Sequence, residues 1–219
     1  MSVWLSILPG LADGLTTTLR LIASSVPLGL LLGIVAALLR VYGPRPLRAV
    51  AATYQSVFRG VPLVVQLFVL YYALPRWGLL LSPFAAATIG FGLCSGAYHS
   101  EYIRSAIRSV PRGQMEAARA LGMSHWTAVG SVVLPQALRK AVPGCGNEIV
   151  YLVKYSSLAY LVTLVDLAGA GRLQAYASFR FFEVFLVVGF VYLAMVAVVR
   201  AALHLLQRCW RRSTAAIGV

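Results

Sequence analysis

Residues 21–39 read LIASSVPLGLLLGIVAALL, a run of 19 residues without a charged side chain, bounded by Arg20 and Arg40. A helix needs about 20 apolar residues to cross the roughly 30 Å of hydrocarbon in a bilayer. This stretch therefore predicts a membrane-spanning helix. It therefore indicates the fold class, an integral membrane protein.

The composition of the whole chain agrees with that prediction. Of its 219 residues, 60 % are hydrophobic and 11 % charged, and the mean hydropathy is +0.81. A soluble domain has about 25 % charged residues. A soluble enzyme is therefore excluded, and we expect an all-α integral membrane protein that forms a single domain over residues 1–219.

Other charge-poor runs extend the pattern to five expected transmembrane helices, at about residues 15–40, 50–74, 82–107, 141–165 and 182–207. The second is long enough only if residues 49–58 lead into it, partly along the interface. The fourth is weaker, because it carries Glu148 and Lys154. A loop is expected at residues 166–183.

The net charge is +13, from 19 basic and 6 acidic residues, and it is unevenly distributed. Residues 1–19 contain no Lys or Arg, whereas 40–59 and 101–140 are rich in Arg. Cytoplasmic loops carry such an excess, so we expect the N-terminus outside and the C-terminus in the cytoplasm. The basic stretches adjoin spans, which favours contact with membrane lipid over nucleic acid.

A cytoplasmic segment of about residues 110–140 is too long for a hairpin. Gln114–Leu121 predicts a helix, because β-branched residues are absent. Gly122 is expected to end that helix in the left-handed conformation, and Ser124 to cap a second short helix through residues 125–128. Pro135 is expected to punctuate the region.

This segment also carries a family pattern. Glu116-Ala117-Ala118, then Gly122, then Val132-x-Leu134-Pro135 resembles the EAA loop of permease subunits of type I ABC importers. Residues 58–66, FRGVPLVVQ, are similar to a segment of the polar amino-acid permeases, the family that transports histidine, arginine, lysine, glutamine or opines. The resemblance covers roughly residues 11–207.

The resemblance implies a coupling loop that docks into a cytoplasmic ABC ATPase dimer. The residues that it assigns to coupling are Glu116, Ala117, Ala118, Gly122, Ser124, His125, Trp126 and Pro135. Glu116 has an alternative, a helical ion pair with Arg112 or Arg119. The resemblance further implies a second permease subunit, which is either a paralogue or an identical copy. It also implies a periplasmic or lipid-anchored amino-acid-binding protein.

Polar residues within expected spans are candidates for a substrate path, since such residues are costly in hydrocarbon. The candidates are Gln66, Glu148, Ser156, Ser157 and Asp166. Two carboxylates suit a cationic amino acid. As alternatives, Glu148 pairs with Lys154 or an arginine, Asp166 is a solvated residue near Arg172, and the hydroxyls bond helix backbone.

The chain is not expected to be an enzyme. Its two lysines, Lys140 and Lys154, do not follow a glycine, so it has no Walker A loop, and its histidines lack metal-ligand spacing. We expect no bound cofactor or metal, with ATP and Mg²⁺ used by the partner ATPase. The expected function is that of a permease for a polar, cationic amino acid in the bacterial inner membrane. The alternative is an ion-coupled carrier or a channel.

Overall fold

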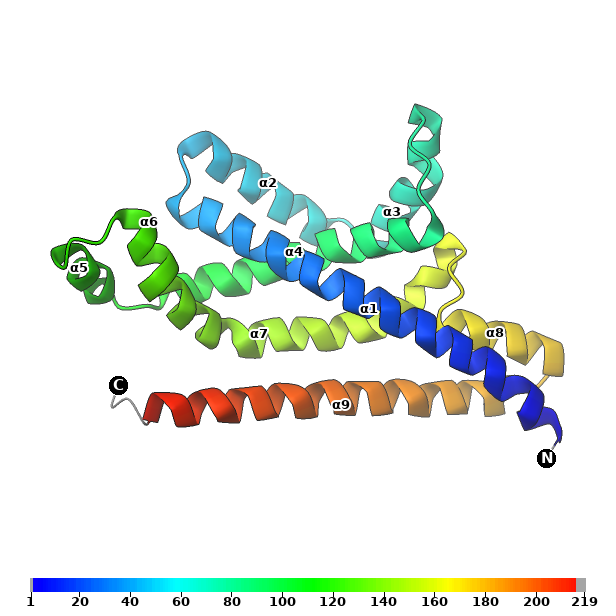
Figure 1. The fold of residues 1–219 in the computed structure, drawn as a ribbon. Coiled ribbons are helices and arrows are strands. Elements are labelled where there is room, and N and C mark those ends of the chain that lie inside the picture. Colours follow the sequence, from blue (N-terminus) through cyan, green and yellow to red (C-terminus); the bar gives the residue numbers. More distant parts are fainter. Residues whose placement is uncertain (1, 216–219) are drawn as a thin grey trace.

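A computed structural model describes residues 2–215, and every regular element within them is a helix (Figure 1). The α-helices are α1 (Ser2–Tyr42), α2 (Arg45–Gly60), α3 (Leu63–Phe68), α4 (Pro83–Arg108), α5 (Arg112–Ala120), α6 (His125–Ala128), α7 (Leu134–Tyr155), α8 (Leu167–Ser178) and α9 (Phe181–Ala215). Two π-helical turns, Val69–Ala73 and Val129–Val133, and two 3-10 helices, Leu74–Trp77 and Ser156–Val162, extend α3, α6 and α7.

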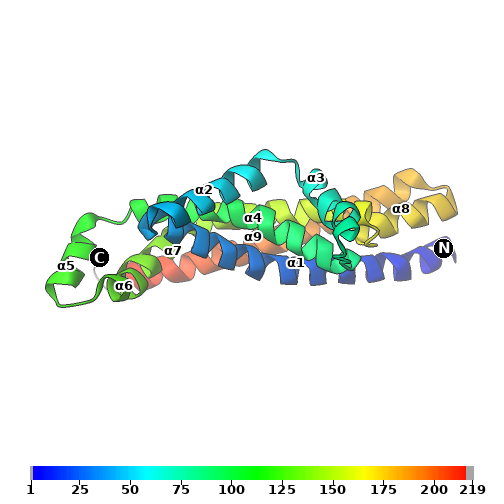
Figure 2. The ribbon, with the colours of Figure 1, turned by 90° about the horizontal axis from the view of Figure 1, so that it is seen from above.

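The long helices α1, α4, α7 and α9 run along one axis of the molecule (Figures 1 and 2). α5 and α6 lie at one end, and α8 lies with the start of α1 at the other. α4 packs mainly against α1 and α7 and contributes more buried residues than any other helix. The centre of the fold is therefore α4.

Glycines allow α1 and α4 to approach closely. A Cβ atom at Gly33 would lie 2.5 Å from His99 Cβ, and one at Gly96 would lie 3.2 Å from the carbonyl oxygen of Gly29. Small residues four apart on each helix thus face each other, as they do where membrane helices pack tightly. A larger side chain at these positions would force the two helices apart.

Two helices, Ile7–Tyr42 and Phe181–Arg208, are long and apolar enough to cross a membrane, and up to four spans result if each of two bent pairs is one span. α4 matches the expected span 82–107 within one residue at each end. It is less hydrophobic than those two helices, because its buried faces carry Gly, Ser and His in place of lipid-facing residues. The number of spans therefore stays a prediction.

The expected second span is broken rather than straight. α2 and the segment that begins with α3 meet at 105°. The break lies at Val61 and Pro62, because proline has no N–H with which to continue the helix. Gln66 holds the bend, since its Nε2 donates to the carbonyl oxygens of Phe58 (3.0 Å) and Val61 (2.8 Å).

Two further local features were not predicted from the sequence. The expected loop at residues 166–183 contains α8, which begins after Asp166. Pro135 does not interrupt the chain, because it lies in the first turn of α7, where a missing N–H has no cost. Through this turn a continuous helical path runs from His125 to Val162.

Candidate functional site

The coupling segment predicted from sequence forms a helix, a turn and a second helix. At the end of α5, Gly122 has a φ of +83°, which is the left-handed conformation that was predicted for it. Its N–H donates to Arg119 O at 3.0 Å, and the N–H of Met123 donates to Ala118 O at 3.1 Å. This pair of bonds is the Schellman arrangement, which sets a fixed angle between the helices that it joins.

α6 begins as predicted and continues into the bundle. Ser124 Oγ accepts the N–H of Thr127 at 3.2 Å and caps the helix. Ala128 and Val129 are buried, and the chain runs on through the π-helical turn into α7. π-helical turns often occur at functional sites. α6 and α7 therefore form one continuous helical path.

The sequence-predicted coupling residues divide between surface and interior. Glu116, Ala117, Gly122, Ser124, His125, Trp126 and Pro135 are exposed, whereas Ala118 is buried. Beside them, Leu121 is 84 % exposed and Trp126 is 62 % exposed. Two large apolar side chains in water at one turn are typical of an interaction site.

Glu116 does not form the alternative ion pair considered from sequence. Within the described residues, neither Arg112 nor Arg119 lies within ion-pair distance of its carboxylate. Arg119 instead donates to Met123 O at 2.9 Å. The Glu116 carboxylate is therefore free to contact another chain.

Tyr42, the last residue of α1, was missed by sequence reasoning. Its ring lies 5.4 Å from the ring of His125 and 6.2 Å from that of Trp126, edge to face in both cases. The only signal in the sequence is an aromatic residue at the end of a span. The cluster joins α6 to α1.

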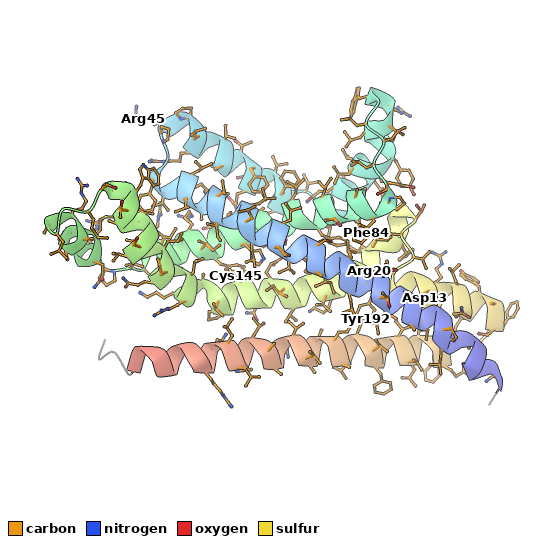
Figure 3. The ribbon with its side chains drawn as sticks, in the orientation of Figure 1. Asp13, Arg20, Arg45, Phe84, Cys145 and Tyr192 are labelled. Atoms are coloured by element: carbon orange, nitrogen blue, oxygen red, sulfur yellow. The ribbon has the colours of Figure 1, made fainter. Side chains whose placement is uncertain are left out.

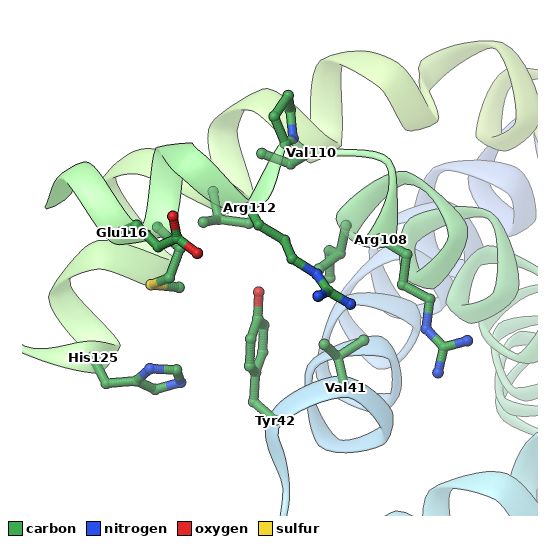
Figure 4. Close-up of a pocket in the computed structure, with 11 residues that line it drawn as sticks. Val41, Tyr42, Arg108, Val110, Arg112, Glu116 and His125 are labelled. Atoms are coloured by element: carbon green, nitrogen blue, oxygen red, sulfur yellow. The ribbon is translucent and has the colours of Figure 1, made fainter. Parts of the chain in front are cut away.

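A cavity of about 680 Å³ lies beside this cluster (Figure 4). It opens between α5 and α6 on one side and the ends of α1 and α4 on the other. Its lining residues are Val41, Tyr42, Ile107, Arg108, Val110, Pro111, Arg112, Met115, Glu116, His125 and Val133.

An ion-pair network nearby ties α1 to α4 and was also missed. Arg40 Nη1 lies 2.6 Å from Glu101 Oε2, and Arg104 bonds to the same carboxylate. The Glu101–Arg104 spacing is visible in sequence, but the partner on α1 depends on tertiary structure. The network holds the end of α1 against α4. Tyr42 lies at this end and contacts α6.

Along the expected substrate path, Glu148 is the buried carboxylate without a partner in the described part of the chain. It lies on α7 and is 5 % exposed. Lys154 does not pair with it, because the Lys154 ammonium lies 4.3 Å from the centre of the Tyr151 ring. Arg59 on α2 also lies beyond ion-pair distance of Glu148.

Three other path candidates bond to helix backbone. Gln66 holds the bend described above, although its Oε1 has no partner in the described residues. Ser156 donates to Val153 O at 2.7 Å, and Ser157 donates to Lys154 O at 2.8 Å. The two serine contacts are the backbone alternative that the sequence left open for the hydroxyl groups.

Asp166 is a helix cap. Its carboxylate accepts the N–H groups of Ala168 (3.2 Å) and Gly169 (3.0 Å) and the hydroxyl of Tyr192 (3.1 Å). Figure 3 shows Tyr192 on the side of α9 that faces the other helices. Asp166 is fully buried, so the alternative that it is a solvated residue near Arg172 was wrong. Arg172 instead lies over the rings of Tyr160 and Tyr176.

The sequence was compared with known protein families and proteins. Residues 29–212 match the model of the binding-protein-dependent transport system inner membrane components. The chain is 36 % identical over 201 residues to the L-cystine transport system permease protein TcyB of Bacillus subtilis, which covers 91 % of this chain and 86 % of that protein. It is 35 % identical to the arginine transport system permease protein ArtQ of the same organism, with 87 % and 88 % covered.

Solved structures of two ABC transporters have a similar fold. The crystal structure of an amino acid ABC transporter with histidines matches with a TM-score of 0.84 at 33 % identity, over 94 % of this chain and 96 % of that one. An inward-facing MetNI methionine ABC transporter matches with a TM-score of 0.80 over 93 % and 97 %. At 21 % identity, it supports the fold alone.

Proposed function

The chain belongs to the family of binding-protein-dependent transport system inner membrane components, and we propose that it forms the translocation path of an ATP-driven importer for a cationic amino acid. It is the membrane subunit of an amino-acid ABC transporter and not an enzyme. ATP hydrolysis resides in a separate subunit.

The proposed topology has five spans, with the N-terminus outside and the C-terminus in the cytoplasm. In this topology, α4 and the bent pairs α2–α3 and α7–α8 cross the membrane together with α1 and α9. The charge distribution supports it, because the Arg-rich stretches 40–59 and 101–140 then lie toward the cytoplasm. The bacterial inner membrane is the proposed location.

The observation that carries the proposal is the continuity of the α5–α6 turn with the bundle. Leu121 and Trp126 are exposed at the turn, while α6 continues without a break into α7. An ATPase that binds the turn would move α7 as a rigid body. Alternating access then requires two packed arrangements of the bundle that differ in free energy by only a few kcal/mol. Glu116 is proposed to meet a basic group of the ATPase.

Glu148 is the proposed contact for a cationic side chain. Its burial on α7 and its lack of an ion pair support this role, because an unpaired carboxylate within a membrane span is costly and usually functional. The permease ArtQ is named for arginine transport and TcyB for cystine transport, so related proteins differ in the charge of their substrates. Asp166 is left out of the path because its carboxylate caps α8.

The proposed assembly contains an ABC ATPase dimer, a second permease subunit and an amino-acid-binding protein on the outer face. The chain itself is proposed to bind no cofactor, with ATP and Mg²⁺ used by the ATPase. The family's name implies a binding protein as partner. Whether the second permease is a copy of this chain or a paralogue decides how many Glu148 side chains face the path.

The test is uptake by proteoliposomes that hold the assembled transporter. Arginine uptake is expected to require ATP and to stop when the ATPase subunit is inactivated, whereas uptake by this chain alone would indicate a carrier. Glu148→Gln is expected to lower arginine uptake about tenfold more than glutamine uptake, a difference of about 1.4 kcal/mol. Equal losses for both amino acids would remove the charge-recognition role.

A further inference from the structure

Most of the residues that line the 680 Å³ cavity have no role in the proposed function. It lies between the proposed coupling unit and the ends of α1 and α4, on the side of that unit that faces the bundle (Figure 4). Leu121 and Trp126, which present the proposed ATPase surface, are absent from its lining. The cavity therefore adjoins the ATPase surface, and Glu116 and His125 lie where the two meet.

The polar groups of the cavity are arranged with basic groups on one side. Arg108 and Arg112 extend toward the same side, and Glu116 and His125 lie across the Tyr42 ring from Arg108 (Figure 4). Within the described residues, neither guanidinium forms a hydrogen bond or lies within ion-pair distance of a carboxylate. Guanidinium groups bind phosphate oxygens with two parallel N–H bonds, so two unpaired guanidiniums that extend toward one side of a cavity favour a phosphate there.

The remaining wall is apolar. Val41, Ile107, Val110 and Val133 belong to the hydrophobic cluster that joins α1, α4 and α7. A free inorganic anion gains nothing from such a wall. An amphiphile does, because it places a charged group against the arginines and apolar atoms against the valines and the isoleucine.

We propose that this cavity binds the headgroup of an anionic phospholipid from the cytoplasmic leaflet, with its phosphodiester between Arg108 and Arg112. Basic pockets between membrane helices on the cytoplasmic side are the sites where anionic headgroups bind. Glu116 and His125 then face the hydroxyl groups of a headgroup such as glycerol. The location in the cytoplasmic leaflet follows the proposed topology, whereas the binding itself does not depend on transport.

Binding is measured on the purified full-length chain in uncharged detergent, by native mass spectrometry, with phosphatidylglycerol, phosphatidylcholine or inorganic phosphate added. We expect phosphatidylglycerol to be retained at least tenfold better than phosphatidylcholine. The double variant Arg108→Gln/Arg112→Gln is expected to lose this preference. Arg108→Lys/Arg112→Lys, which keeps both charges, is expected to retain part of it.

The matched control is Arg45→Gln/Arg139→Gln, which removes two exposed arginines that do not line the cavity and is expected to bind as the wild type does. An unchanged preference in Arg108→Gln/Arg112→Gln would overturn the proposal. Displacement of the lipid by millimolar inorganic phosphate would assign the site to a free anion and would also overturn it. If the Arg→Gln variant instead weakens ATPase association while lipid retention stays normal, the arginines serve the partner protein and not a lipid.

Discussion

Tyr42, the last residue of α1, lies edge to face against His125, the first residue of α6, with ring centroids 5.4 Å apart. The contact connects the first membrane helix to the proposed coupling unit, and Trp126 completes the cluster. α6 is therefore connected to two helices, to α7 through the chain and to α1 through these rings. An ATPase bound at α5–α6 would move both.

Removal of the Tyr42 ring should weaken the connection to α1. Aromatic pairs contribute about 0.5–1.5 kcal/mol beyond their buried area. In Tyr42→Ala, we expect the ATPase to bind and hydrolyse ATP while the number of amino acids transported per ATP falls. Tyr42→Phe keeps the ring and is expected to behave as the wild type. Parallel assays of uptake and phosphate release measure the ratio, and an unchanged ratio in Tyr42→Ala would show that the cluster is dispensable.

The turn at Gly122 should tolerate no β-branched residue. A left-handed conformation costs an L-residue about 1–2 kcal/mol, and a Cβ at Gly122 would otherwise meet open space. Gly122→Val should therefore distort the turn and reduce ATPase co-isolation, with membrane insertion intact. Gly113→Val is the matched control, since Gly113 also has open space but lacks a positive φ. Equal effects of both substitutions would argue against a conformational role.

Asp166 should matter for stability and not for substrate charge. Loss of an N-cap costs about 0.5–2 kcal/mol, so Asp166→Ala is expected to lower the thermal midpoint in detergent. The Asn side chain in Asp166→Asn still accepts a backbone N–H through its one oxygen, so this variant should keep most of the thermal stability. In uptake assays, Asp166→Asn should leave the ratio of arginine to glutamine transport unchanged. A shift in that ratio would return Asp166 to the substrate path.

Close packing of α1 on α4 predicts a strong effect of bulk at Gly33. Its added Cβ would lie 2.5 Å from His99 Cβ, which cannot move without α4. Overpacking of this kind costs about 1–3 kcal/mol, so Gly33→Leu should lower thermal stability. Gly189→Leu on α9 is the control, because no atom lies within 4 Å of its added Cβ. Comparable losses in the two variants would contradict the packing argument.

The sequence predicted those features that depend on local residues. The bounds of α4, the left-handed Gly122 and the Ser124 cap follow from apolar runs and from cap chemistry, and all three appear in the structure. The resemblance in residues 116–135 pointed to the family that the comparisons then showed.

Features that depend on tertiary contacts were not predictable from one sequence. The bend after α2 needs Gln66 to reach back to Phe58 O, and α8 needs a buried Asp166 held by Tyr192. The contact between Tyr42 and His125 joins residues far apart in the chain. The bonds of Ser156 and Ser157 are local by contrast, because each goes to a carbonyl oxygen three residues earlier, and the sequence had left them open as an alternative.

The most direct test of the central claim is a photo-cross-link from the exposed turn. With p-benzoyl-phenylalanine in place of Leu121, irradiation of membranes that contain the assembled transporter should yield an adduct with the ATPase subunit, and its yield should change when ATP is added. The same probe in place of Leu193, an exposed residue of α9, should yield none. Absence of the ATPase adduct at position 121 in a complex that still transports would contradict coupling through α5 and α6.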